Sequence, residues 1–148
     1  MPGILIIAHA PLASALKAVA RHTFPDCARA LEALGVTLEM EIEEIEAAAR
    51  MLLERVRSPC ALVLTDVLSA TPGNVAQKLV DGPSVRLLAG VNVPMLWCAL
   101  SKACGSLEEM AGCAADRAKL GVVQVASSPP QNQTLKRRSH DSEDGQDQ

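Results

Sequence analysis

Two uninterrupted apolar runs constrain the fold of this chain more than any other feature. One is ILII within residues 3–9, and the other is ALVL within the stretch CALVLTDV at residues 60–67. A strand without polar alternation is buried on both faces, which is typical of the central strands of a parallel sheet covered by helices. We therefore predict that residues 3–9 and 60–67 form the two central strands of such a sheet.

The segments between and after these runs predict further strands alternating with helices. The stretch VTLEMEI, residues 36–42, alternates apolar and polar residues, which predicts a strand at a sheet edge with one solvent-exposed face. Two more strands are predicted at residues 84–91 and 122–126. Apolar periodicity, proline positions and a Ser106/Glu109 capping box predict five helices. They run from Pro11 to before Pro25, over 43–57, from Pro72 to about 80, from the turn at Pro94, and from Ser106 to before Gly121.

This alternation predicts an α/β fold with an open, mostly parallel sheet and helices on both faces. With the two apolar strands in the centre and residues 36–42 at an edge, the strand order is 2-1-3-4. Ligands of such sheets bind at the carboxyl ends of the strands, where the order reverses direction. That point lies between the strands that end at His9 and at Asp66.

Composition sets the class of protein. The chain has 148 residues, of which 49% are hydrophobic, which suits one domain with an aliphatic core. The net charge of −3, without a basic patch among aromatic residues, argues against a nucleic-acid partner. No signal peptide and no apolar run of membrane-spanning length is found, so we expect a cytoplasmic protein without direct membrane insertion.

The five cysteines form no CxxC pair and are expected to be reduced, mostly buried thiols without a metal site.

The composition changes at Ser127. Residues 127–148 contain one apolar residue, Leu135, among polar and charged ones. Such a segment cannot bury enough apolar surface to fold. We predict a folded domain over residues 1–126 followed by a disordered polar tail over residues 127–148.

His9 and Asp66 have the chemistry of a nucleophilic site. A carboxylate that faces one imidazole nitrogen fixes the tautomer and leaves the other nitrogen unprotonated. Since no serine or cysteine is expected between them, the histidine itself is the candidate nucleophile. The structural alternative is a core histidine that is bonded to a backbone carbonyl.

The stretch SATPGN, which follows Asp66, predicts a helix N-terminus that can bind an anion. Thr71 is a suitable N-cap and Pro72 a suitable first helical residue. The helix dipole and the free backbone N–H groups after Pro72 would stabilise a negative charge near His9. The alternative is a plain strand-to-helix turn. The residues predicted to bind a phosphoryl group carried by His9 are Ala70, Thr71, Gly73 and Asn74.

Three segments carry a resemblance to a known family. They are IIAHA with His9, LVLTDVLSATPGNVA with Asp66, and LLAGVNVPML. In this order and at these separations, residues 2–126 resemble the IIA domain of the mannose/fructose-type sugar phosphotransferase system (PTS).

The resemblance implies a phosphotransferase with a phosphohistidine intermediate and no cofactor. His9 would accept a phosphoryl group from the phosphocarrier protein HPr and pass it to a IIB component, which can be a separate chain, or use it for regulation. Asp66 would orient the ring, and Thr71 matches a hydroxyl residue that lines the phosphoryl site. Members of this family are homodimers in which the last strand crosses to the partner, a role that residues 122–126 fit.

The chain departs from the family pattern at two points. Ser69 and Ala70 stand where the family often has two glycines, which would narrow the approach of a partner's backbone. Gly73 replaces a bulky apolar residue, which would remove a large apolar contact from the surface on which a partner docks.

Three other functions are weighed against the phosphocarrier. The main alternative is a small-molecule binding or regulatory module of the same fold without phosphotransfer. A receiver-like module phosphorylated on Asp66 is disfavoured, because Ala8 and His9 stand where acidic magnesium ligands are needed. A hydrolase is disfavoured because neither Ser14 nor Ser69 lies in a nucleophile elbow.

Overall fold

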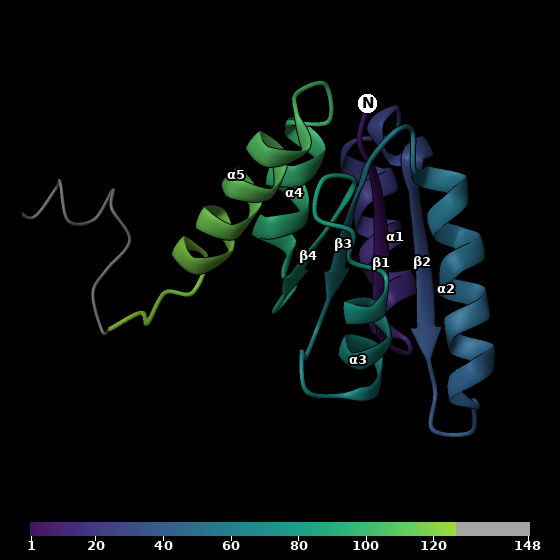
Figure 1. Cartoon of the computed structure of the whole chain (residues 1–148). Helices are drawn as coiled ribbons and strands as arrows, with labels where there is room; N and C mark the ends of the chain where they lie inside the picture. Colours follow the sequence, from purple (N-terminus) through teal and green to yellow (C-terminus); the bar gives the residue numbers. More distant parts are fainter. Residues whose placement is uncertain (127–148) are drawn as a thin grey trace, which may run out of the picture.

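The computed structural model describes residues 1–126 and arranges them as one parallel sheet covered by helices on both faces (Figure 1). The tail predicted at residues 127–148 lies outside the described residues. In the described part of the chain, no helix is both long and apolar enough to cross a bilayer. The elements are β1 (Gly3–His9), α1 (Leu12–Thr23), a 3₁₀ helix (Cys27–Ala30), β2 (Leu31–Val36), α2 (Ile42–Val56), β3 (Ala61–Thr65), α3 (Thr71–Lys78), β4 (Val85–Ala89), α4 (Val93–Ser101) and α5 (Leu107–Leu120).

The strand order is β2-β1-β3-β4, with every neighbouring pair parallel. In this register Ile6 lies between Ala33 of β2 and Leu64 of β3. The predicted α/β class and the order 2-1-3-4 are therefore confirmed. The order reverses between β1 and β3, which places the carboxyl ends of these two strands side by side.

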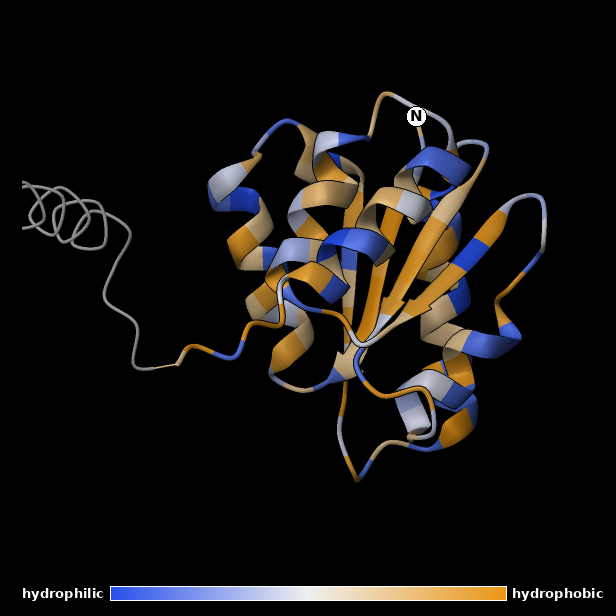
Figure 2. Ribbon diagram, turned by 90° about the vertical axis from the view of Figure 1, so that its left-hand side faces the viewer, coloured by the Kyte–Doolittle hydropathy of each residue, from blue (hydrophilic) through white to orange (hydrophobic). Residues whose placement is uncertain are grey.

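Two separate cores flank the sheet because successive side chains of a strand point to opposite faces. Ile4, Ile6 and Leu64 pack with residues of α1, α4 and α5. Leu5 and Ile7 pack with residues of α2 and α3 on the other face. Figure 2 shows the resulting hydrophobic sheet between helices that turn hydrophilic residues outward. Burial on both sides explains why β1 and β3 contain uninterrupted apolar runs.

The predicted strand at residues 36–42 is wrong in its position. The strand is β2, Leu31–Val36, and residues 37–41 form the loop before α2. The alternation was misleading because Leu38 points entirely into solvent, at 100% exposure, while Met40 packs against the core beside α2. The inner residues of β2 are half-buried, as expected of an edge strand.

The predicted strand at residues 122–126 does not form within residues 1–126. These residues have no strand partner, and Val122, Val123 and Val125 are 81%, 69% and 81% exposed. The outer edge of β4 also has no neighbouring strand in the described part of the chain. Residues 122–126 can form a strand only if another strand donates and accepts hydrogen bonds beside them. Exchange of this strand between two copies of the chain therefore stays a prediction.

Side chains fix the starts of α4 and α5. The capping box predicted for α5 is confirmed, because the Ser106 hydroxyl accepts the Glu109 N–H at 3.1 Å and Glu109 accepts the Ser106 N–H at 3.4 Å. Asn92 caps α4 by accepting the Met95 N–H at 2.9 Å, and its amide nitrogen donates to the Ala118 carbonyl at 3.1 Å. Asn92 thereby joins the start of α4 to the end of α5.

Cys98 of α4 and Cys113 of α5 form a disulfide, which corrects the expectation that all five cysteines are reduced. The two helices pack against each other and bring these Cα atoms to 6.1 Å, within the range that a disulfide spans. Their separation of 15 residues matches no short cysteine motif, so no local pattern predicts the pair. Cys27, Cys60 and Cys104 are free.

Candidate functional site

His9 and Asp66 meet at the carboxyl edge of the sheet. The ring Nδ1 of His9 lies 2.7 Å from Oδ2 of Asp66. The same Oδ2 accepts the backbone N–H of His9 at 3.0 Å, and Oδ1 accepts the backbone N–H of Val67 at 2.8 Å. Three N–H groups thus hold one carboxylate, which fixes both its position and the ring plane opposite it.

The ring of His9 faces outward from this carboxylate. The His9 side chain is 49% exposed, whereas the Asp66 side chain is 12% exposed. A carboxylate at Nδ1 favours the tautomer with the proton on Nδ1, so Nε2 carries the free lone pair. An exposed imidazole with a carboxylate partner differs from the core histidine that the sequence left open as an alternative. The pair can carry out nucleophilic chemistry at Nε2.

Local interactions keep Asp66 ionised. Burial raises the pKa of this carboxyl, but the hydrogen bonds from the His9 backbone, the His9 ring and the Val67 backbone outweigh burial and hold the pKa below its ordinary value. Asp66 is therefore negatively charged at neutral pH, and its charge is available to stabilise a positive charge on the ring.

The lowered pKa of Asp66 predicts a pH-dependent contribution to stability. A carboxyl with a depressed folded-state pKa stabilises the fold fully above its unfolded pKa of about 4 and loses that contribution as the pH falls through the folded-state pKa. Urea unfolding between pH 7 and pH 3 should show a steeper loss of unfolding free energy in the parent than in Asp66→Asn. Two parallel pH profiles would contradict this role of the carboxylate.

The start of α3 lies beside His9, one residue earlier than predicted. Ala70 is the N-cap, and Thr71 is the first helical residue, so the Thr71 hydroxyl does not cap the helix. Thr71 and His9 instead line one hollow of about 120 Å³ at the edge of the sheet. The hydroxyl of Thr71 is therefore free to contact a group on the ring.

Two backbone N–H groups of the first turn of α3 remain available. The Asn74 N–H donates to the Ala70 carbonyl at 2.9 Å, so the expectation that it is free is wrong. Within residues 1–126, the N–H groups of Thr71 and Gly73 have no acceptor. Thr71 is exposed and lines the hollow, so its N–H group, with the positive end of the helix dipole, can bind an anion there. Gly73 is buried and does not line the hollow.

Gly73 is buried, which corrects its predicted place on a docking surface. A Cβ at this position would lie 2.4 Å from the carbonyl oxygens of both Val67 and Leu68. The glycine thus lets the loop after β3 fold directly onto the first turn of α3. Sequence reasoning missed Gln77, whose amide nitrogen donates to the Leu68 carbonyl at 3.2 Å and the Gly73 carbonyl at 3.3 Å and holds this loop.

Sequence reasoning also missed the loop between β2 and α2 as a wall of the site. Thr37, Leu38, Met40 and Ile42 line the same hollow as His9. They were overlooked because the sequence placed residues 36–42 in a strand. Asn92 and Met95, which belong to the segment LLAGVNVPML, line a different hollow together with residues of β4 and α5.

Acidic and aliphatic side chains surround the hollow. The described residues at this edge of the sheet include five large aliphatic side chains that are 39–100% exposed: Leu12, Leu38, Ile42, Val67 and Leu68. The loop and first turn of α2 add four exposed glutamates: Glu39, Glu41, Glu43 and Glu44. Within residues 1–126, no three His, Cys, Asp or Glu side chains gather where they could hold a metal ion.

Comparisons with solved structures match this fold. The mannose/sorbose-specific IIA subunit of the phosphotransferase system from Enterococcus faecalis has a TM-score of 0.76 and 22% identity, with 87% of this chain and 98% of that chain covered. Phosphotransferase system component EIIA from Streptococcus agalactiae has a TM-score of 0.72 and 22% identity, with 84% and 97% covered. The PTS IIA protein associated with the fucose utilization operon from Streptococcus pneumoniae has a TM-score of 0.68 and 23% identity, with 83% and 92% covered.

Comparison of the sequence with protein families identifies one family over most of the chain. No curated protein sequence matches. Residues 3–116, which include β1, β3 and the start of α3, match the family described as PTS system fructose IIA component (EIIA-man). The chain therefore belongs to the EIIA-man family of phosphotransferase-system IIA components.

Proposed function

We propose that the protein is a phosphohistidine carrier of the phosphoenolpyruvate-dependent sugar phosphotransferase system. It accepts a phosphoryl group from HPr on His9 and passes it to a IIB protein or uses it for regulation. The observation that carries this proposal is the 2.7 Å contact between Nδ1 of the exposed His9 ring and the nearly buried Asp66 carboxylate. A cytoplasmic location stays a prediction of the sequence.

The geometry supports a direct in-line transfer to Nε2. The lone pair of Nε2 attacks the phosphorus of the donor phosphohistidine, the donor P–N bond breaks, and the donor ring keeps that electron pair. The His9 ring then carries a positive charge with its proton on Nδ1, and the Asp66 carboxylate at 2.7 Å stabilises that charge. The hydroxyl and the backbone N–H of Thr71, which lines the hollow together with His9, are the donors for the phosphoryl oxygens.

The surroundings of His9 favour a protein as phosphoryl donor. An exposed aliphatic patch rimmed by polar groups is typical of a protein-binding surface. The glutamates of the β2–α2 loop repel small anionic phosphoryl donors and attract a partner with a basic rim. Electrostatic attraction of this kind mainly accelerates association.

The alternative of a small-molecule module is less well supported. The hollow beside His9 measures about 120 Å³, below the range of roughly 300–1,000 Å³ that is usual for small-molecule sites. A phosphoryl group on the ring fits this hollow better than a sugar or a nucleotide does.

A homodimer is the assembly that the proposal includes. Two features support it: the exposed valines at residues 122–126 have no strand to pair with, and the outer edge of β4 has no neighbouring strand within residues 1–126. A strand from a second copy on β4 would bury both.

The proposal is tested by phosphorylation with phosphoenolpyruvate, enzyme I and HPr, followed by intact mass and peptide mapping at neutral pH. We expect one added phosphoryl group on His9 that is lost in acid and kept in base. His9→Ala should remain unlabelled, and His22→Ala, at an exposed position on α1, should label like the parent.

Three outcomes would contradict the proposal. Labelling of the His9→Ala variant would show that a residue other than His9 carries the phosphoryl group. A label stable in acid and lost in base would indicate an acyl phosphate, as in the receiver-like reading of Asp66. No label with active control proteins would favour the binding module.

A further inference from the structure

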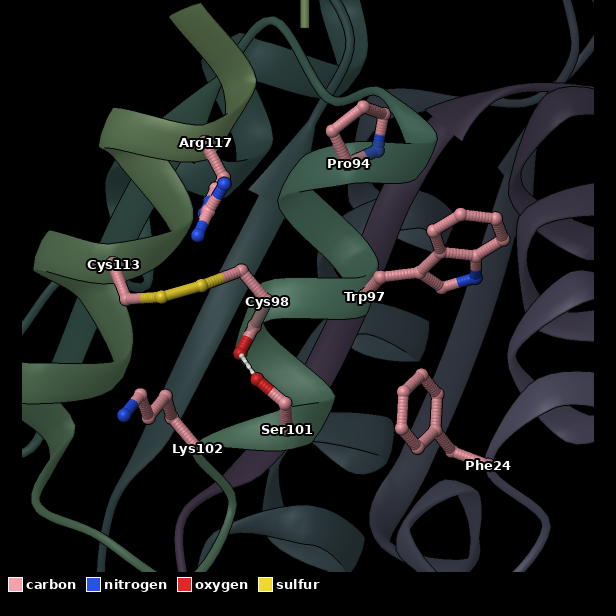
Figure 3. Close-up of a pocket in the computed structure, with 8 residues that line it drawn as sticks. All are labelled: Phe24, Pro94, Trp97, Cys98, Ser101, Lys102, Cys113 and Arg117. Carbon is pink, nitrogen blue, oxygen red and sulfur yellow. Dashed lines mark hydrogen bonds between the residues drawn. A yellow bond between two sulfur atoms is a disulfide. The ribbon is translucent and has the colours of Figure 1, made fainter. Parts of the chain in front are cut away.

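A second hollow, of about 440 Å³, contains the Cys98–Cys113 disulfide (Figure 3). It is lined only by residues of α4 and α5, by Lys102 just after α4, and by Phe24 just after α1. None of these residues belongs to the site around His9. The disulfide is therefore part of a concave surface that a small molecule can enter.

The disulfide lies between two cations. Lys102 follows Cys98 by four residues and Arg117 follows Cys113 by four, so each cation lies about one helical turn from its cysteine. Figure 3 shows Arg117 on one side of the disulfide and Lys102 on the other. Within residues 1–126 neither cation has an ion-pair partner, and no Asp or Glu lines the hollow. This surface attracts anions to the sulfur atoms.

The remaining wall of the hollow is apolar except for Ser101, whose hydroxyl donates to the Cys98 carbonyl. It contains Phe24 and Trp97, which are the only aromatic side chains of the chain, together with Pro94. Trp97 is 44% exposed, although indole side chains are usually more buried. An organic ion can place its apolar part against this wall and its charge near the cations.

The two cysteine residues differ in exposure. Cys98 is buried at 8% exposure, whereas Cys113 is half-buried. An incoming thiolate therefore reaches Sγ of Cys113 first, and Cys98 is the leaving group. Positive charges nearby stabilise thiolates, which favours both the approach of an anionic thiol and the departure of Cys98.

From these observations we propose that the Cys98–Cys113 disulfide is a thiol-exchange site for low-molecular-weight anionic thiols of the glutathione type. In the first step a thiolate bonds to Sγ of Cys113, the Cys98–Cys113 bond breaks, and Cys98 leaves as a thiolate that takes up a proton. In the second step another thiolate attacks the sulfur of the bound small thiol, which releases a small-molecule disulfide and the Cys113 thiol. Two small thiols are oxidised and one protein disulfide is reduced, and a small-molecule disulfide drives the reverse reaction.

The position of exchange is tested with variants that keep only one cysteine of the pair, in a Cys27→Ser/Cys60→Ser/Cys104→Ser background that removes the three free thiols. Oxidised glutathione should form a mixed disulfide with Cys113 in Cys98→Ser at least tenfold faster than with Cys98 in Cys113→Ser. Acid quenching, alkylation and peptide mapping locate the adduct. Equal rates, or no adduct on Cys113, would overturn the proposal.

The role of the cations is tested on the parent disulfide with two thiols of opposite charge. Reduction by glutathione, which carries one net negative charge, is compared with reduction by cysteamine, which carries a positive one. The glutathione-to-cysteamine rate ratio should fall about tenfold in Lys102→Gln/Arg117→Gln and should also fall with added salt. Comparing ratios cancels the intrinsic reactivity of each thiol.

The readouts are alkylation mass and the fluorescence of Trp97, which lines the same hollow as the disulfide. This fluorescence should rise as the quenching disulfide is reduced. Arg50→Gln/Arg55→Gln on α2 is the matched control, because it removes the same charge from the other side of the sheet. An unchanged rate ratio in the Lys102/Arg117 variant, or an equal fall in the control, would overturn the proposal. Neither experiment involves His9, so its result is independent of the proposed phosphotransfer.

Discussion

Asp66→Asn is expected to slow phosphoryl transfer from HPr to His9 by about 10²- to 10⁴-fold, by analogy with the loss seen when a triad aspartate becomes an amide. In the proposed mechanism the parent carboxylate stabilises the positive charge that develops on the ring, and an amide carries no charge to do so. The loss should therefore appear in the transfer step, with little change in the affinity for HPr.

The hydrogen bonds of Asp66 explain why an amide cannot replace the acid. Oδ2 accepts two N–H groups of His9 and Oδ1 accepts the N–H of Val67, so both oxygens face donors. An asparagine must turn its NH₂ group toward one of these sets. If the NH₂ group faces the ring, the ring proton must move to Nε2, which removes the nucleophilic lone pair. If the NH₂ group faces Val67, the hydrogen bond that the Val67 N–H donates to residue 66 is lost.

Rapid-quench transfer from phosphorylated HPr measures this effect, with Asp116→Asn, an exposed position of α5, as the control for net charge. The control should transfer at the parental rate. A folded Asp66→Asn protein with near-parental transfer would remove Asp66 from the mechanism.

Gly73→Ala is expected to destabilise the protein by about 2–4 kcal/mol and to lower the rate of His9 phosphorylation. The new Cβ would lie 2.4 Å from two backbone carbonyl oxygens, those of Val67 and Leu68, and a backbone cannot rotate away as a side chain can. The loop after β3 must shift, and the Val67 N–H that holds Asp66 shifts with it.

Gly112→Ala is the matched control for this substitution. Gly112 lies on an exposed part of α5, and nothing lies within 4 Å of its ideal Cβ. The higher helix propensity of alanine should stabilise that variant by about 0.5–1 kcal/mol. Urea unfolding of both variants gives the comparison, and a Gly73→Ala protein as stable as the parent would show that the loop yields without cost.

The central strands and the meeting of His9 with Asp66 could be predicted because they depend on burial alone. A run such as Ile4–Ile7 has no polar face to expose, so it can only lie between two helical layers. Once β1 and β3 are neighbours, the residues at their carboxyl ends must be close. The catalytic and phosphoryl-binding roles of these residues stay predictions until transfer is measured.

Other features depend on contacts that local patterns do not contain. Alternation at residues 36–42 has the period of a strand, but Leu38 faces solvent and Ile42 starts a helix. Thr71 is a better N-cap than Ala70 by propensity, yet the close packing of Gly73 under the loop sets where α3 starts. The Cys98–Cys113 pair follows from how two helices pack, which no spacing rule encodes.

The arrangement of β1 also determines when during synthesis this protein can become active. Its two neighbours in the sheet are β2 and β3, and Asp66 is made 57 residues after His9. A nascent chain therefore carries its most apolar strand and its histidine without their partners until β3 has left the ribosome, and such distant pairings are slow to form. Under the proposed function, His9 could therefore be phosphorylated only after β3 has paired with β1, because Asp66 follows directly after that strand.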